Sequence, residues 1–338
     1  MSYKEIVEYL SKEKGITICW STVAIRTKRI FDAIGEEVPR AKGKSSIQVS
    51  DQELYRLKQK CMSYSEISKY LERKGEKKMI DIEKAKNAFE KFLEKYSDKE
   101  QLAFKLKVVH TYHVVENARQ IATKLNLQEE DIKLAELIAL LHDIGRFEEI
   151  NFLKQFDSVR FDHASYGIKM LFDDNLIRTF IEDDKYDEII KVAIYNHSRL
   201  TIEDGLNNKC LLHSKIIRDA DKLDNFRVKK DEKIEAIFPG KINSKDDMES
   251  STLSDKVYNT VRNKKCVNIQ DRLTMLDYWV CALAFIFDLN FKESYQIVKE
   301  NNYINILIDR FKYNDLITKE RMEHIRNIIN EFIDNNVL

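Results

Sequence analysis

The chain has 338 residues and equal numbers of basic and acidic side chains, 57 of each, which gives a formal net charge of zero. This balance excludes a global electric field that would draw the protein to nucleic acid or a membrane, and any such contact must be local. Only 8 Gly and 2 Pro accompany 34% charged and 43% hydrophobic residues, a composition that favours helices over turn-rich sheets. We therefore predict an all-α fold.

The cysteines and the apolar runs indicate the compartment. The five cysteines are odd in number and are never paired at metal or redox spacing. The N-terminus has no apolar signal core, and the best membrane candidate, "YWVCALAFIF", is too short to span a bilayer. We expect a soluble cytoplasmic protein with no membrane partner.

Two similar stretches, "MSYKEIVEYL" at residues 1–10 and "MSYSEISKYL" at 62–71, each combine a helix-capping Ser with a Glu three residues later. They predict two helix-turn-helix-like modules, residues 1–45 and 46–96. This region resembles modules of prokaryotic regulators whose basic second helix lies in the DNA major groove. Arg26, Lys28 and Arg29 are therefore candidate nucleic-acid-binding residues, and a helical interaction or dimerisation module is an equal alternative.

Helical periodicity is nearly continuous from about residue 100 onward. It is interrupted only by short polar loops such as "LTIEDGLNNK" and "FPGKINSKDDMESS". We predict a helical domain over residues 97–338, in which the second loop separates a central unit from a helical C-terminal extension.

The stretch "LIALLHDIGRFEEI", residues 137–150, sets His142 and Asp143 at the end of a helix that is apolar on essentially every face. Such a helix is buried. We expect Gly145 to end it. A carboxylate buried at the negative end of a helix dipole is costly unless something positive compensates, and a metal ion is one candidate.

Three more histidines lie on core-facing stripes. His110 shares a face with Val114 and Ala118, His197 lies on an apolar stripe, and His163 shares a face with Gly167, which would let another helix approach closely. A single histidine of this kind is usually a core residue, but together with the buried His-Asp pair they favour a metal site. In "HSKIIRDADKLDNF", periodicity does not choose a further ligand among Asp219, Asp221 and Asp224.

A helical His, then "HD" ending an apolar helix, then "AD" before Lys and an apolar residue resembles the HD-domain superfamily of metal-dependent phosphohydrolases. The resemblance implies an HD-domain helical bundle over roughly residues 100–310. The metal ligands that it implies are His110, His142, Asp143 and Asp221. Members that bind two metals add histidines, which here would be His163 and His197, with Asp143 bridging the ions. Such donors suit Mn, Fe, Co, Ni, Zn and, less well, Mg.

Basic side chains near the implied ligands are candidates for holding a substrate phosphate. Lys107, Arg146 and Arg218 each lie about one helical turn from a ligand, and guanidinium groups suit phosphate. We take all three as candidate substrate-binding residues, and Asp143, Arg146 and Arg218 as candidate catalytic residues. The alternative is that the three cations make ordinary surface ion pairs.

The expected function is metal-dependent hydrolysis of a phosphoester of a nucleotide or cyclic nucleotide, since a bound divalent ion lowers the pKa of its water. One alternative is an HD-type nuclease that acts on DNA or RNA held by the N-terminal modules. Another is a DNA-binding regulator whose HD domain senses a nucleotide. The sequence leaves the metal, the substrate and the oligomeric state open, and an oligomer is compatible with it.

Overall fold

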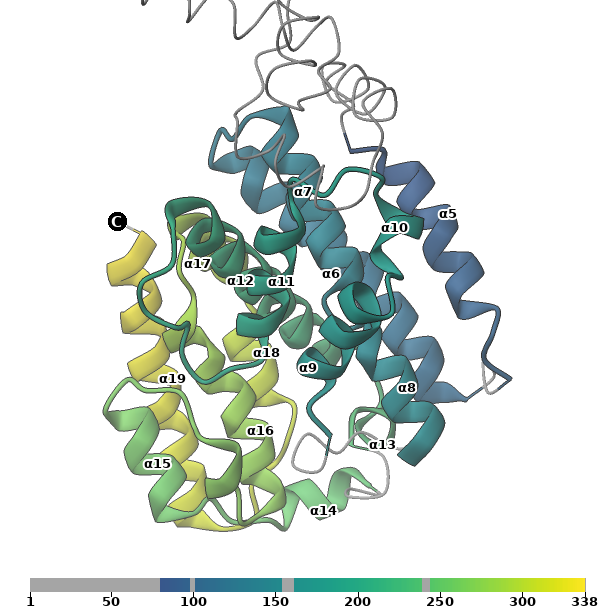
Figure 1. Cartoon of the computed structure of the whole chain (residues 1–338). Coiled ribbons are helices and arrows are strands. Elements are labelled where there is room, and N and C mark those ends of the chain that lie inside the picture. The colour runs from purple at the N-terminus through teal and green to yellow at the C-terminus, as the bar shows by residue number, and fades with distance from the viewer. Residues whose placement is uncertain (1–79, 98–100, 154–160, 239–243, 338) are drawn as a thin grey trace, which may run out of the picture. The chain divides into compact units, whose positions relative to one another are not determined.

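A computed structural model describes residues 80–97, 101–153, 161–238 and 244–337, all within one compact unit, Met79–Leu338. Every regular element in these ranges is a helix (Figure 1), which confirms the predicted all-α class. None of the described helices is long and apolar enough to cross a membrane. Arg26, Lys28 and Arg29, with most of the two predicted N-terminal modules, lie outside the described residues.

Four helices form the centre of the unit. The long helices α6 (Leu102–Lys124) and α12 (Asn208–Asp231) lie against each other, while α7 (Glu129–Leu141) packs on α6 and α11 (Asp187–His197) packs on α12 (Figure 1). Residues 134–141 of α7 are buried without exception, as expected for a helix that is apolar on every face. Five of the six candidate ligands lie on or directly after these central helices, and the sixth, His163, begins α9.

Helix α5 (Ile82–Leu93) begins at Asp81, whose side chain accepts a hydrogen bond from the backbone N–H of Lys84. It packs against α7 and the short helix α10 (Ile177–Phe180). Its buried rings join a cluster of aromatic contacts that comprises Phe89, Phe92, Tyr96, Phe104 and Phe147. Residues 82–96 thus share a core with helices of the predicted 97–338 domain, although the predicted boundary places them with the second module.

The turn from α7 to α8 (Ile144–Leu153) differs from the prediction. Gly145 does not end the apolar helix: α7 ends at Leu141, and Gly145 lies in the first turn of α8. A Cβ atom on Gly145 would lie 2.2 Å from the backbone oxygen of His163 and 2.9 Å from the backbone nitrogen of Gly167. Gly145 is therefore required for the close approach of α8 to α9 (His163–Ile168), and the close approach expected at Gly167 is confirmed.

Every regular element in the described part of the C-terminal extension is a helix. Its elements are α13 (Ile234–Ile237), α14 (Lys245–Glu249), α15 (Asp255–Arg262), η2 (Ile269–Asp271), α16 (Met275–Leu283), η3 (Ala284–Asp288), α17 (Lys292–Glu300), α18 (Tyr303–Asp309) and α19 (Leu316–Val337). The predicted polar loop after residue 237 contains α14, which a capping box of Ser244 and Asp247 begins. A π-helical segment, η1 (Lys169–Asp173), continues α9 in the central part.

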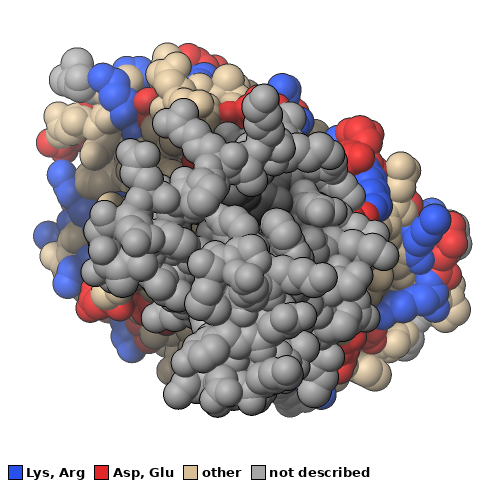
Figure 2. Space-filling model, turned by 45° about the horizontal axis from the view of Figure 1, so that its top comes forward, with Lys and Arg blue, Asp and Glu red and all other residues tan. Residues whose placement is uncertain are grey.

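The surface reflects the balanced composition. On the face shown in Figure 2, basic and acidic side chains of the described residues are interspersed around the rim. No broad area of one sign is visible among the described side chains of that view. This arrangement agrees with the expectation that any contact with a charged partner is local.

We predict that Gly145→Ala lowers the free energy of unfolding by about 3 kcal/mol, because the new methyl group meets backbone atoms that cannot rotate away. Gly167→Ala should cost less, since its Cβ would meet the Ile144 side chain at 3.2 Å and the Gly145 nitrogen at 3.3 Å. Urea denaturation of both variants measures the difference. Equal stability of Gly145→Ala and the wild type would contradict the close backbone contact.

Candidate metal centre

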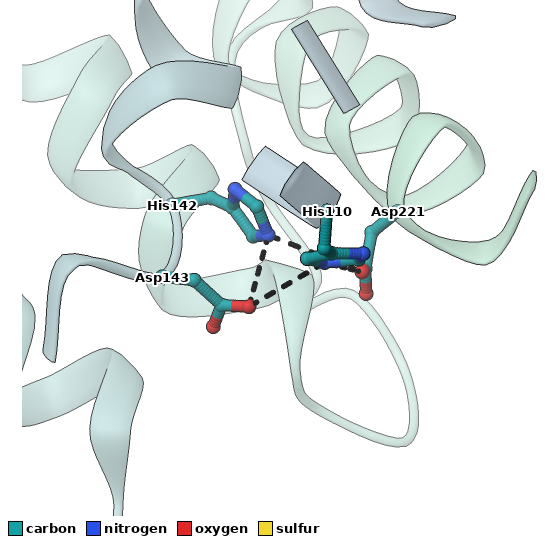
Figure 3. Close-up of side chains that lie close together, drawn as sticks. All are labelled: His110, His142, Asp143 and Asp221. Atoms are coloured by element: carbon teal, nitrogen blue, oxygen red, sulfur yellow. Dashed lines mark ion pairs between the residues drawn. The ribbon is translucent and has the colours of Figure 1, made fainter. Parts of the chain in front are cut away.

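Four of the candidate ligands converge (Figure 3). His110 comes from the middle of α6, His142 and Asp143 from the turn between α7 and α8, and Asp221 from α12. The Nε2 atom of His110 lies 3.1 Å from Oδ1 of Asp221, and the Nε2 atom of His142 lies 3.1 Å from Oδ2 of Asp143. One donor atom from each side chain lies within 4.8 Å of all the others. The structure therefore brings together the set that the sequence resemblance implied.

The other ring nitrogen fixes the orientation of each histidine. Nδ1 of His142 donates a hydrogen bond to the backbone oxygen of Ala139 at 2.7 Å, and Nδ1 of His110 lies 2.6 Å from Oδ2 of Asp224. With the proton on Nδ1, each Nε2 atom presents a lone pair to the centre. Both Nε2 atoms are buried, and the polar atoms that they face are the carboxylate oxygens of Asp221 and Asp143. Lone pairs of nitrogen thus face carboxylate oxygens, an arrangement that a cation would stabilise, so the residues fit a metal ion.

A second group lies on the opposite side of Asp143. The Oδ1 atom of Asp143 is 3.2 Å from Nε2 of His163 and 3.4 Å from Nε2 of His197, and the two Nε2 atoms are 3.2 Å apart. His163 is the first residue of α9, and His197 is the last residue of α11. Because Oδ1 and Oδ2 face different groups, Asp143 has the placement of a bridging carboxylate. The ligand roles of all six residues remain a prediction.

An ion pair and a hydrogen bond hold the second group in place. Arg199, two residues after His197, pairs with Asp162 at 2.7 Å. Asp162 is the residue before α9 and accepts a hydrogen bond from the backbone N–H of Ser165. Nδ1 of His197 donates to the backbone oxygen of Ile194 at 2.6 Å. The ion pair ties the end of α11 to the start of α9, and the two hydrogen bonds orient each helix end.

The electrostatics favour the protonation states that metal ligands need. Burial lowers the pKa of His142, and burial together with Arg146 holds the pKa of His163 well below its usual range. Burial opposes ionisation of Asp143, but Lys107 and His142 hold its pKa well below the ordinary value. Neutral imidazoles and an ionised carboxylate at neutral pH are the forms that bind metals.

His110 behaves differently from the other histidines. Burial and the neighbouring Lys107 lower its pKa, but hydrogen bonds to Asp221 and Asp224 outweigh them and raise it. The hydrogen bond to His110 in turn lowers the pKa of Asp221 despite its burial. The proton shared among these groups is the one that a divalent ion would displace from Nε2.

The structure separates the three aspartates that periodicity could not. Asp221 lies in the cluster, and Asp224 is fully buried behind His110, where it also accepts a hydrogen bond from Arg227 at 2.5 Å. Asp219 lies on another side of α12 and accepts hydrogen bonds from the backbone nitrogens of Asn290 and Phe291. The supporting role of Asp224 was missed at the sequence level, although its inward position on the helix was the available signal.

Two of the three predicted phosphate-binding cations lie at the site. The ammonium group of Lys107 contacts Oδ2 of Asp143, and its side chain is 12% exposed. The Nε atom of Arg146 lies 3.7 Å from Oδ1 of Asp143, and its Nη1 atom donates to the buried carboxylate of Glu149 at 2.6 Å. Both cations therefore border the space around Asp143.

Arg218 differs from the prediction. Its terminal nitrogens donate to the backbone oxygens of Asn196, Arg199 and Leu200, and it also pairs with Asp288 at 2.5 Å. Its side chain is 2% exposed. All four terminal N–H groups are used within the fold, and the remaining Nε–H group is buried, so Arg218 offers no accessible donor to a substrate phosphate. We correct its assignment from catalytic and substrate-binding residue to a residue that holds the end of α11 against α12.

Residues 108–225 match the family model of the HD domain. The match supports the HD-domain superfamily for this part of the chain, confirms the expected helical bundle and contains all six candidate ligands. An HD domain implies divalent-metal binding and metal-dependent phosphohydrolase activity in general. The matched range ends at α12, before the C-terminal helices. No curated protein and no solved structure matches the chain.

We predict that Asp224→Ala weakens binding of Mn²⁺ about 10- to 100-fold, because His110 loses the partner that fixes its tautomer and ring orientation. Calorimetric titration of the apoprotein with Mn²⁺ measures the affinity. Asp231→Asn, at the partly exposed end of the same helix, is the matched control and should bind like the wild type. Wild-type affinity in Asp224→Ala would contradict the supporting role.

Proposed function

We propose that the chain hydrolyses a phosphoester of a nucleotide or cyclic nucleotide with the help of one or two divalent ions. The observation that carries this proposal is the buried carboxylate of Asp143, which belongs to two separate groups of potential metal ligands, one with His110, His142 and Asp221 and one with His163 and His197. Such a double set resembles the sites that hold two metal ions and act on phosphoesters. The HD-domain match supports the same reaction class.

Two sets of side chains would hold the ions: His110, His142, Asp143 and Asp221 in the first, and Asp143, His163 and His197 in the second. When bound there, a divalent ion supplies a Lewis acid and lowers the pKa of a coordinated water toward neutrality. The low exposure of the surrounding side chains excludes bulk water and strengthens every electrostatic interaction at the site.

Lys107 and Arg146 would bind and orient the substrate. Both are cations that interact with the carboxylate of Asp143. A substrate phosphate bound beside Asp143 would offer them a second anionic partner. Glu149, fully buried, holds the Arg146 guanidinium by a hydrogen bond and limits its rotation. Lys107 approaches from α6 and Arg146 from α8, so the two charges come from different elements.

We predict that His142→Ala and Asp143→Ala each lower metal-dependent phosphoester hydrolysis by more than about 100-fold, since a lost ligand should cost more than a lost supporting residue. The helical circular-dichroism spectrum should stay close to that of the wild type. Hydrolysis is measured against a panel of nucleotides and cyclic dinucleotides, with the metal identified by elemental analysis.

His113→Ala is the matched control, because His113 is exposed on α6 only three residues after His110. It should retain wild-type activity. Full activity in both His142→Ala and Asp143→Ala would reject the proposed function, and hydrolysis that is insensitive to chelators would reject the metal requirement.

The nuclease and the nucleotide-sensing regulator stay predictions, because Arg26, Lys28 and Arg29 lie outside the described residues. Single-stranded and double-stranded substrates compared with free nucleotides would separate a nuclease from a nucleotide hydrolase. Since α5 shares the core of the central helices, a deletion that tests the N-terminal region should end at residue 78 and leave α5 intact.

A further inference from the structure

Lys229 is a buried cation that the metal centre does not explain. It lies two residues before the end of α12 and is 7% exposed. Within the described ranges, no carboxylate lies at ion-pair distance from its ammonium group, which instead lies 5.9 Å from the ring centroid of Phe238. Buried lysines are rare unless they are paired, so this one calls for a physical explanation.

A second cation, Arg272, lies in the same neighbourhood. Its guanidinium carbon lies 4.3 Å from the ring centroid of Tyr278, and the Tyr278 ring meets the Phe238 ring edge-on at 6.3 Å. The Nε atom of Arg272 donates to the backbone oxygen of Ile269, and Arg272 also forms a hydrogen bond with the thiol of Cys281. Burial raises the pKa of this thiol, which keeps it neutral, and no described carboxylate pairs with the guanidinium. Two positive charges thus adjoin the same pair of aromatic rings with no counter-ion from the described residues.

This arrangement costs the folded protein stability. Burial lowers the pKa of Lys229 to about 8, against the opposing effects of Cys281, Asp221 and Asp224, and the charge of Arg272 lowers it as well. At neutral pH the ammonium group is therefore mostly protonated, but it lacks the partner that would offset its desolvation. An anion from outside the described fold would supply that partner.

The position of Lys229 relates this charge to the metal centre. It follows Asp221 by eight residues on the same helix, which corresponds to about 12 Å along the helix axis. Lys229 and the candidate ligand Asp221 thus lie on one continuous helix, about two turns apart. A molecule with one phosphate at Asp143 and a second phosphate one or two nucleotide units away would span this distance.

We propose that Lys229 and Arg272 bind a second phosphate group of the substrate, at a distance from the phosphate that is hydrolysed. The substrate class is then a nucleotide with two separated phosphates or a short oligonucleotide, and the Phe238 and Tyr278 rings offer an apolar surface to the sugar or base between them. This inference rests on the proposed function and narrows its substrate.

The test is calorimetric binding of three probes to the full-length chain with a chelator present, so that none is hydrolysed. The probes are adenosine 3′,5′-bisphosphate, a 5′-phosphorylated linear dinucleotide and AMP, and inorganic phosphate is titrated as a separate control. Lys229→Met and Arg272→Met should each weaken binding of the better two-phosphate probe about tenfold and change AMP binding by less than about twofold. Lys230→Met, the exposed neighbour on α12, is the matched control and should bind all probes like the wild type.

Three outcomes would overturn the inference. One is unchanged binding of both two-phosphate probes in Lys229→Met and Arg272→Met. The second is an equal loss of affinity for AMP and for the two-phosphate probes. The third is a loss of affinity for inorganic phosphate of the same size. Either of these results would indicate an independent anion site. If the protein binds a two-phosphate probe in a Lys229-dependent way but hydrolyses no substrate with any metal, the proposed function is rejected and the second phosphate site stands.

The thermal midpoint provides a separate check that the variant is folded. Methionine fills nearly the same volume as lysine and needs no counter-ion, so Lys229→Met should melt at the same temperature as the wild type or above it. A lower melting temperature would show that the ammonium group is satisfied within the fold, and this result would also overturn the inference.

Discussion

The structure depends on one buried carboxylate. Asp143 is 5% exposed, and its two oxygens face imidazole nitrogens on both sides, so this buried charge depends on positive groups beside it, of which Lys107 is one. Helices α6, α7 and α12 supply the side chains on one oxygen, and α9 and α11 supply those on the other. Five helices of the central bundle therefore surround a single charged residue, Asp143.

Helix α12 connects that centre to the C-terminal extension. Its inward side carries Asp221 and Asp224, while Arg218 and Lys222 pair with Asp288 and Asp219 accepts hydrogen bonds from Asn290. These contacts fix the rotation of α12 about its own axis, and with it the direction in which Asp221 points. The extension lies outside the HD-domain match, yet its contacts with α12 help to orient the candidate ligand Asp221.

The sequence predicted the helical fold because periodicity and composition are local properties, and it predicted the ligand set because the His, His-Asp and Asp pattern resembles a family. Arg218 was wrongly assigned because spacing along a helix gives the distance to a neighbour but not the direction of a long side chain. Asp224, Glu149 and Lys229 were missed for a related reason. Their roles depend on which groups of other helices face them, and periodicity in one helix does not contain that information.

The contact between Gly145 and Gly167 has a consequence for how this site can vary. The spacing between the two groups around Asp143 is set where α8 and α9 meet backbone to backbone, with no side chain between them at these positions. A side chain at Gly145 would meet backbone atoms, so a single substitution at the contact would change that spacing only at a cost in stability. A different spacing in an equally stable fold would instead require a concerted movement of a whole helix, driven by substitutions behind the contact.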